Sequence, residues 1–487
     1  MSTHENIFKK FYSKKKINVS DKDLLIKMFN DLLKMDISTK DNLQTFQDKR
    51  DCIEKHIDNE FEENEFLMKS DIGNEERKKI FENFTQLIIP IFDEYREKLN
   101  KKYLESETAI KLETPFDIYR RNLQNEVDLF CKENIELNKR IQKICTEITV
   151  QQGKLRANYN GEEYTIIQLY PFHLSNDRNV RKATFEAYLE TKESIVDIID
   201  EKFNKLLTLR HNTAENAGYN NYTKYRFKEL QRFDWDENHC FEFHEAVKKQ
   251  FVPLKIKLLE QRKKGLNIEI LRPYDLMCDP YGRDALKIFD KNNINSFIEG
   301  IGKIVKSIDE EFYEYFLNLK NNNLMDIEAR KNKAQEGYMA KYPIYEQASI
   351  FYNCVGLSDD LLGILHELGH CFHYFLGKDI KPFPLQDWSC EVAEAGSMSI
   401  EYIGIENINE YLNKNECKRI KEDRLRGNID FFCYCAQVDK FQHWIYSNPN
   451  HTIQMRRAKW LELTKEYGND IIDITGYEEA ISKVHWQ

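Results

Sequence analysis

The sequence predicts a mainly α-helical protein with one small β-sheet. Apolar residues recur every three or four positions through residues 1–150 and again through 177–319, which is the period of an amphipathic helix. The 487 residues include only 10 Pro and 18 Gly, so a turn-rich all-β fold is disfavoured. Patterns typical of strands are confined to two short stretches, residues 154–169 and 337–353.

The composition is that of an acidic globular chain. It is 41% hydrophobic and 32% charged, which is enough apolar material for a large core. Lys and Arg number 72 against 82 Asp and Glu, and the net charge of −10 argues against a general nucleic-acid binder. The longest apolar run, residues 87–92, contains Pro90 and is far too short to span a bilayer. No nucleic-acid or membrane partner is therefore expected.

Cysteine usage favours a reducing compartment. The chain has 11 Cys, an odd number, and they are scattered through apolar contexts with no pattern of a disulfide framework. Cys433 and Cys435 are one residue apart with no second pair nearby, so we interpret them as small core residues.

The first part of the chain is expected to be a helical packing lobe. Residues 1–150 alternate apolar and charged faces, with Pro90 and Pro115 as the main interruptions, and contain no recognisable chemical motif. We place a soft domain boundary between residues 1–165 and 166–487, because no low-complexity linker marks it.

Three features organise the middle of the chain. Residues 154–169 alternate in period two around Asn160-Gly161, the strongest short signal for a hairpin. Helical periodicity returns at residue 177 and is broken at 271–282, a loop rich in Pro and Gly. Residues 337–353, rich in Tyr and Ile, are expected to form short strands.

The chemistry is carried by a predicted helix over residues 361–376, with Ser358 as its N-cap. It contains His366-Glu367-Leu368-Gly369-His370, an H-E-x-x-H motif. Residues four apart share a helix face, so both imidazoles can reach one tetrahedral zinc ion. Glu367 points elsewhere and is the candidate general base. A helix that merely buries these polar groups would leave them unpaired, at about 1–3 kcal/mol each.

The third metal ligand is expected from a second helix, residues 388–404. Glu391, Glu394 and Glu401 share one face of it, among small and apolar neighbours. Carboxylates on such a surface need a cationic partner. We assign Glu394 as the ligand and Glu401 as the acceptor that orients a ligand His, with Glu391 as the competitor for either role.

A metzincin site is excluded by the residues that follow the motif. That pattern needs Gly three residues and His six residues after the second His, and these positions hold His373 and Leu376. His373 lies on the ligand face one turn further on, so contact with the site and a packing role both stay open.

These residues resemble the oligoendopeptidase F and thimet oligopeptidase family of zinc peptidases. HELGHCFH followed by EVAEAGSMSIE has the spacing from His370 to Glu394 that this family uses for its glutamate ligand. Further stretches are similar to the oligoendopeptidase F branch, at residues 174–188, 214–227, 271–282 and 438–452. The resemblance covers most of the chain from about residue 150 onward.

The resemblance implies a mainly α, two-lobed, gluzincin-like zincin body with a deep channel. Residues 166–487 would form the catalytic domain, with one Zn²⁺ per chain on the channel floor and short peptides as substrates. A cytoplasmic location is implied, and the oligomeric state stays open. The mechanism would be hydrolysis by a zinc-activated water with Glu367 as base.

The family's C-terminal cluster of Tyr and His donors is expected beyond Gln487, where this sequence stops. Because losing one such donor costs on the order of 10²–10³ in turnover, three alternatives stay open. The chain is a peptidase, a weak or inactive zinc- and peptide-binding protein, or part of a longer enzyme. Tyr338, Tyr342 and Tyr345 are candidate substitute donors, although packing is the more frequent role of such residues.

Overall fold

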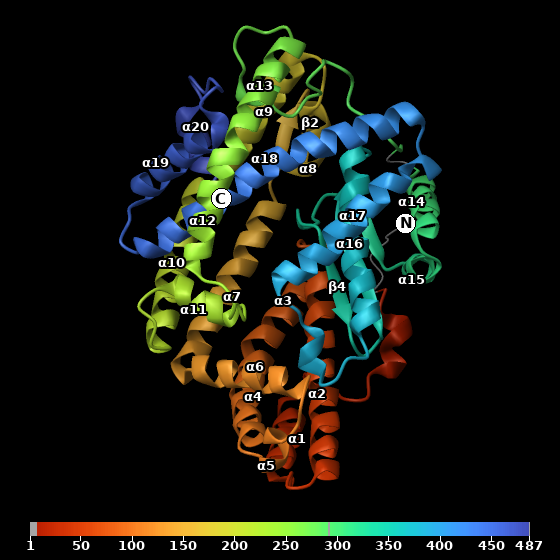
Figure 1. Cartoon of the computed structure of the whole chain (residues 1–487), viewed down its shortest axis with the longest axis vertical. Helices are drawn as coiled ribbons and strands as arrows, with labels where there is room; N and C mark the ends of the chain where they lie inside the picture. The colour runs from red at the N-terminus through yellow and green to blue at the C-terminus, as the bar shows by residue number, and fades with distance from the viewer. Residues whose placement is uncertain (1–6, 291–292, 487) are drawn as a thin grey trace.

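The computed structural model describes residues 7–290 and 293–486 and is mainly helical (Figure 1). The first helices are α1 Lys22–Lys34, α2 Lys40–Ser70, α3 Glu75–Asn83, α4 Ile89–Leu104, α5 Glu107–Ile110, α6 Phe116–Leu129 and α7 Lys132–Gly153. A hairpin and six helices follow: β1 Ala157–Tyr159, β2 Glu162–Tyr164, α8 Ile166–His173, α9 Arg178–Glu193, α10 Val196–Asn216, α11 Tyr222–Glu229, α12 Glu237–Gln250 and α13 Val252–Gly265.

The chain from α14 onward contains the three-stranded sheet and the longest of the described helices. Its elements are α14 Ile294–Ile308, α15 Glu310–Asn321, β3 Met325–Glu328, β4 Tyr338–Tyr342, β5 Gln347–Cys354, α16 Ser358–Gly377, α17 Cys390–Asn407, α18 Lys414–Ser447, α19 Ile453–Thr464 and α20 Glu478–Val484.

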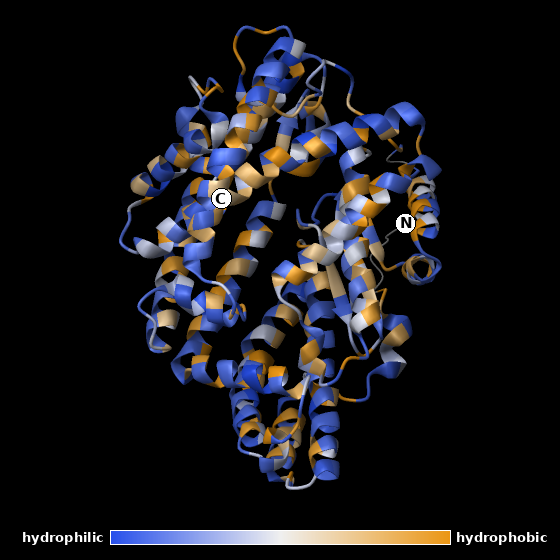
Figure 2. Cartoon of the chain, in the orientation of Figure 1, coloured by the Kyte–Doolittle hydropathy of each residue, from blue (hydrophilic) through white to orange (hydrophobic). Residues whose placement is uncertain are grey.

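The predicted amphipathic helices are confirmed. Figure 2 shows hydrophobic and hydrophilic residues alternating along the long helices. Pro115 stands directly before α6 and ends the preceding segment, as expected. Pro90 lies in the first turn of α4, where a missing N–H costs little, so it does not separate α4 from the helical turn before it. In the part of the chain that the structure describes, no helix is long and apolar enough to cross a membrane.

The predicted hairpin is present but shorter than expected. β1 and β2 pair antiparallel, and the turn has positive φ at Asn160 (52°) and Gly161 (80°). The prediction of strand at residues 166–169 is wrong. Thr165 accepts a hydrogen bond from the Gln168 backbone while the Gln168 side chain accepts one from the Thr165 backbone, and this capping box starts α8.

The break in the second helical region is longer than predicted. It runs from the end of α13 to the start of α14, with one short 3₁₀ turn at Pro273–Asp275. Asp275 is fully buried and accepts hydrogen bonds from Arg178 and Arg181 of α9. This ion-pair cluster attaches the loop to the helical body.

A small sheet supports the helix that carries the H-E-x-x-H motif, as predicted. The strand order is β3-β5-β4, with β3 parallel and β4 antiparallel to β5. α16 packs against β5, and α17 packs beside α16 (Figure 1). One core cluster joins Phe8 and Phe66 to Phe351 and Leu365, so Phe8, near the start of the described chain, shares a core with the sheet. The division at residues 165/166 stays a prediction.

α18 connects two sides of the molecule. It contacts α17 at one side and α12, α13 and α19 at the other, and Figure 1 shows it crossing between them. Side chains along this one helix therefore reach regions that are distant in the sequence.

Candidate metal centre

The start of α16 is set by a carboxylate inside its first turn. Asp360 Oδ2 accepts hydrogen bonds from the backbone N–H groups of Val355, Gly356 and Leu357, at 2.9, 2.7 and 2.9 Å. The N-cap residue is Leu357, so the prediction of Ser358 as N-cap is wrong by one position. Asp360 therefore accepts from the backbone N–H of the N-cap residue and of the two residues before it, and this contact places the start of the helix at Leu357.

Three predicted ligands meet beside α16. His366 Nε2 and His370 Nε2 are 3.2 Å apart. Glu394 of α17 places Oε2 at 3.2 Å from His366 Nε2 and Oε1 at 3.7 Å from His370 Nε2. One donor atom from each of the three residues lies within 4.8 Å of the others.

Close packing of α16 on α17 brings the carboxylate within reach of the two imidazoles. A Cβ at Gly369 would lie 2.6 Å from the Ser397 Cα and 3.0 Å from the Ser397 carbonyl oxygen. A side chain at this position would therefore push the two helices apart. The motif's glycine thus permits the approach that places Glu394 next to the His pair.

Glu401 orients His366 from one side. Its Oε1 is 2.7 Å from His366 Nδ1, and its Oε2 pairs with Arg424 Nη2 of α18 at 2.6 Å. Burial alone would lower the pKa of His366, but the contacts with Glu394 and Glu401 raise it to about 10. Arg424 had no signal in the sequence, because an Arg on a long amphipathic helix is ordinary.

Glu367 is buried beside the three candidate ligands. It is 6% exposed, and its Oε2 is buried without a hydrogen-bond partner among the described residues. Burial raises the pKa of Glu367 to about 7, helped by the charges of Glu394 and Glu401. An unpaired carboxylate oxygen at this place is suited to accept a proton.

Two further candidates have other partners. Glu391 pairs with Arg232, its Oε1 lying 2.7 Å from Nη2. His373 stacks on Trp388, with ring centroids 3.7 Å apart. Neither side chain belongs to the group formed by His366 and the other two predicted ligands.

The three candidate donor tyrosines differ in their surroundings. Tyr342 and Tyr345 are fully buried, and their hydroxyls bond to Ser349 and Glu63. Tyr338 has a buried hydroxyl without a partner among the described residues. Tyr352, which no motif marks in the sequence, lines the cavity over the candidate metal centre.

A cavity of about 920 Å³ opens over the centre and is lined by His366, Glu367 and Glu394. A second cavity of about 610 Å³ shares Tyr170 and Tyr352 with the first, so the two adjoin. His485 lines the second cavity, and burial lowers the pKa of its imidazole to about 4.

The donor set fits a divalent cation. Two imidazole nitrogens and a carboxylate converge on one point at the edge of the cavity. His366 Nε2 and His370 Nε2 face each other with at most one proton between them, and a cation would contact both nitrogens and the carboxylate together. Two His and one Glu, with an open side, is the ligand set of many hydrolytic zinc sites.

Comparison with known proteins gives a consistent result. The model of Peptidase family M3 matches residues 172–483. The chain is 23% identical over 325 residues to oligopeptidase PepF of Bacillus subtilis, covering 64% of this chain and 46% of that protein. It is 26% identical over 293 residues to an oligoendopeptidase F homolog of Borreliella burgdorferi, covering 57% of this chain and 46% of that protein. The chain spans about half the length of these curated relatives.

A solved structure agrees over a longer stretch. PZ peptidase A with an inhibitor matches with a TM-score of 0.92 at 24% identity, covering 98% of this chain and 84% of that one. This likeness shows the fold and confirms the expected mainly α, zincin-like body. Since the family model covers well over half of the sequence, the chain belongs to peptidase family M3, in its oligoendopeptidase F branch.

Proposed function

We propose that this protein is a zinc-dependent oligoendopeptidase, with His366, His370 and Glu394 as ligands of one Zn²⁺. The observation that carries the proposal is the convergence of these three side chains at the edge of a large cavity. When bound there, zinc would lower the pKa of a water toward about 7 and polarise a substrate carbonyl.

Glu367 is the general base of this proposal. It follows His366 directly on α16, lines the cavity, and has a free, buried carboxylate oxygen. It takes a proton from the attacking water and passes it to the leaving amine. General acid–base catalysis of this kind contributes about 10²–10⁴-fold.

Glu401 and Arg424 are positioning residues. The hydrogen bond from His366 Nδ1 to Glu401 keeps Nε2 facing the cavity, and Arg424 holds the other oxygen of Glu401. Such partners keep a ligand imidazole in one tautomer and one orientation.

The cavity supports short peptides as substrates. Its volume of about 920 Å³ is at the upper end of the range for small-molecule pockets, roughly 300–1,000 Å³, and the adjoining cavity of about 610 Å³ adds further room. The eleven cysteines, all free thiols, support a reducing and cytoplasmic location.

Cleavage of a quenched fluorescent peptide tests the proposal. Zinc-loaded parent protein should cleave it, and Glu367→Gln should be slower by about 10²–10⁴-fold with the same zinc content. Equal rates in the two proteins would overturn the role of Glu367. Peptide that the zinc-loaded parent binds but leaves intact would favour the alternative, a zinc- and peptide-binding protein without hydrolysis.

A further inference from the structure

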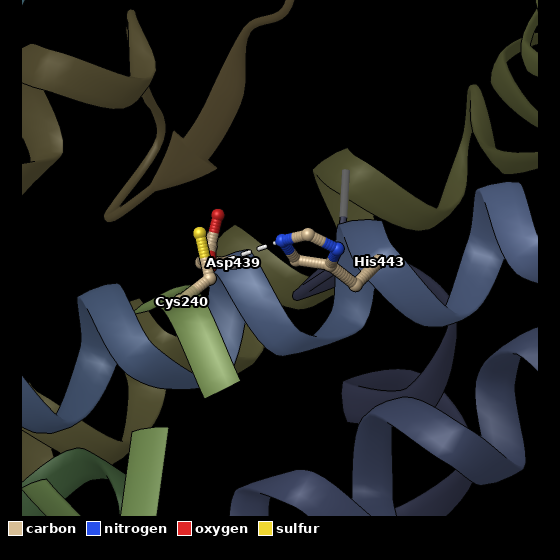
Figure 3. A group of neighbouring side chains, drawn as sticks. All are labelled: Cys240, Asp439 and His443. Atoms are coloured by element: carbon tan, nitrogen blue, oxygen red, sulfur yellow. Dashed lines mark ion pairs between the residues drawn. The ribbon is translucent and has the colours of Figure 1, made fainter. Parts of the chain in front are cut away.

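A second group of metal-binding side chains lies between α12 and α18, on elements other than the helices of the first centre. Cys240 and His244 are four residues apart on α12, and Asp439 and His443 are four residues apart on α18. Residues at this spacing share a helix face. The two helices pack side by side, and Figure 3 shows Cys240 directed from α12 toward Asp439 and His443 of α18.

The donor atoms of this group are close together. Cys240, Asp439 and His443 each offer one atom within 4.8 Å of the others. His443 Nε2 is 3.5 Å from Asp439 Oδ2, and His244 Nε2 is 2.7 Å from the same oxygen. Tetrahedral zinc bonds of about 2.0–2.3 Å would set donors roughly 3.3–3.8 Å apart, so the distances between donors need to shorten by about 1.5 Å at most.

The surroundings favour a bound ion over a solvated polar patch. Cys240 and His443 are buried at 8% and 7% exposure, and the ring of Phe241 lies 5.1 Å from that of His443. Among the described residues, the ion pairs of Asp439 go to His244 and His443, with no Lys or Arg. A half-buried carboxylate next to a buried thiol and two buried imidazoles is the kind of group that a divalent cation stabilises.

We propose that Cys240, Asp439 and His443 bind a second zinc ion. Sulfur, nitrogen and oxygen donors together suit Zn²⁺ better than the hard cations Mg²⁺ and Ca²⁺, which prefer oxygen alone. The thiolate and the carboxylate neutralise the charge of the ion. The side chain of Asp439 is 42% exposed, so a water can occupy the fourth position.

His244 is the positioning residue of this site. It is 1% exposed, and its hydrogen bond to Asp439 Oδ2 holds the carboxylate in place. Loss of such a partner typically weakens metal binding by about 10–100-fold.

The proposed role is structural. The ion would link α12 to α18 and stabilise their packing. α18 also contains Arg424, which pairs with Glu401 at the first centre. The proposal does not depend on peptidase activity, because the two sites share no ligand.

Cobalt substitution distinguishes the two sites. A thiolate bound to Co²⁺ gives a near-ultraviolet charge-transfer band, and the first centre has only His and Glu ligands. We expect the band in cobalt-loaded parent protein and in His366→Ala, and its loss in Cys240→Ser. Cys390→Ser is the matched control, because Cys390 is exposed in the cavity over the first centre. No band in the parent, or a band that survives Cys240→Ser, would overturn the proposal.

Zinc titration with thermal unfolding gives an independent readout. In the His366→Ala background, zinc should raise the unfolding midpoint, since binding to the folded state alone stabilises it. The same addition should have no effect when His443→Ala is also present. Should Cys240→Ser fail to fold, Asp439→Asn serves as the second test, with the same expected loss of the band. An equal zinc effect in the single and double variants would contradict the site.

Discussion

His366 Nδ1 lies 2.7 Å from Glu401 Oε1, so a carboxylate on α17 contacts an imidazole of α16 at the ring nitrogen that faces away from the candidate metal site. The opposite nitrogen of the same ring faces Glu394 and His370. The two faces of His366 are thus divided between a positioning contact and a proposed metal contact.

Glu401→Ala should weaken zinc binding by about 10–100-fold, because His366 loses the acceptor that orients its ring. Competition with a chelator of known affinity measures the change. Glu406→Ala is the control, since Glu406 is exposed on the same helix and pairs with Lys421. Equal affinities in the two variants would contradict the positioning role.

Gly369→Ala should destabilise the fold by about 1–3 kcal/mol, because its Cβ meets backbone atoms of Ser397 at 2.6 and 3.0 Å. Zinc affinity should fall as well, since Glu394 moves away from the His pair. Chemical denaturation gives the free energy of unfolding. Gly427→Ala on α18 is the control, because nothing lies within 4 Å of its Cβ, and the change should stabilise the helix by up to about 1 kcal/mol. An unchanged free energy of unfolding in Gly369→Ala would contradict the close packing of α16 on α17 at this position.

Asp275→Asn should cost about 3–5 kcal/mol of unfolding free energy, because it leaves Arg178 and Arg181 without their buried partner. Asp473→Asn is the control. Asp473 pairs with Arg272 near the same loop but is partly exposed, so a much smaller loss is expected. Similar losses in both variants would mean that burial of Asp275 contributes little.

The contribution of Asp275 should also depend on pH. Burial alone would raise the pKa of Asp275, but the hydrogen bonds from Arg178 and Arg181 hold it below its ordinary value. The unfolded chain then takes up this proton at a higher pH than the folded chain. The stabilisation is complete above the ordinary pKa of about 3.9 and is lost as the pH falls through the lower folded value. The difference between parent and Asp275→Asn, measured by urea unfolding, should therefore shrink below about pH 4 and stay constant above it.

Local patterns were enough for much of the fold. The helices, the Asn160-Gly161 turn and the strands after residue 337 depend on neighbours a few positions apart, and the structure has them. The wrong predictions concern helix starts, where side-chain hydrogen bonds to the backbone override the apolar–polar pattern. Thr165 and Gln168 start a helix where alternation predicts a strand, and Asp360 bonds back to the Leu357 N–H, so the N-cap is Leu357 and not Ser358.

The sequence by itself determined that His366, Glu367 and His370 share one helix, because the helical repeat sets their directions. Glu391, Glu394 and Glu401 share one face of α17, so periodicity alone could not separate their roles. The tertiary structure gives the three side chains different partners: Glu394 lies next to the His pair, Glu401 contacts His366 Nδ1, and Glu391 pairs with Arg232.

Contacts between distant segments were decided only by the tertiary structure. Arg424 reaches Glu401, and Cys240 meets Asp439, through the packing of α18 against α17 and α12. The periodicity of the sequence does not predict such a contact between two helices, because the contact depends on how the helices pack against each other. The sequence alone determines which side chains one helix can present together, and the packing of helices decides which of them meet.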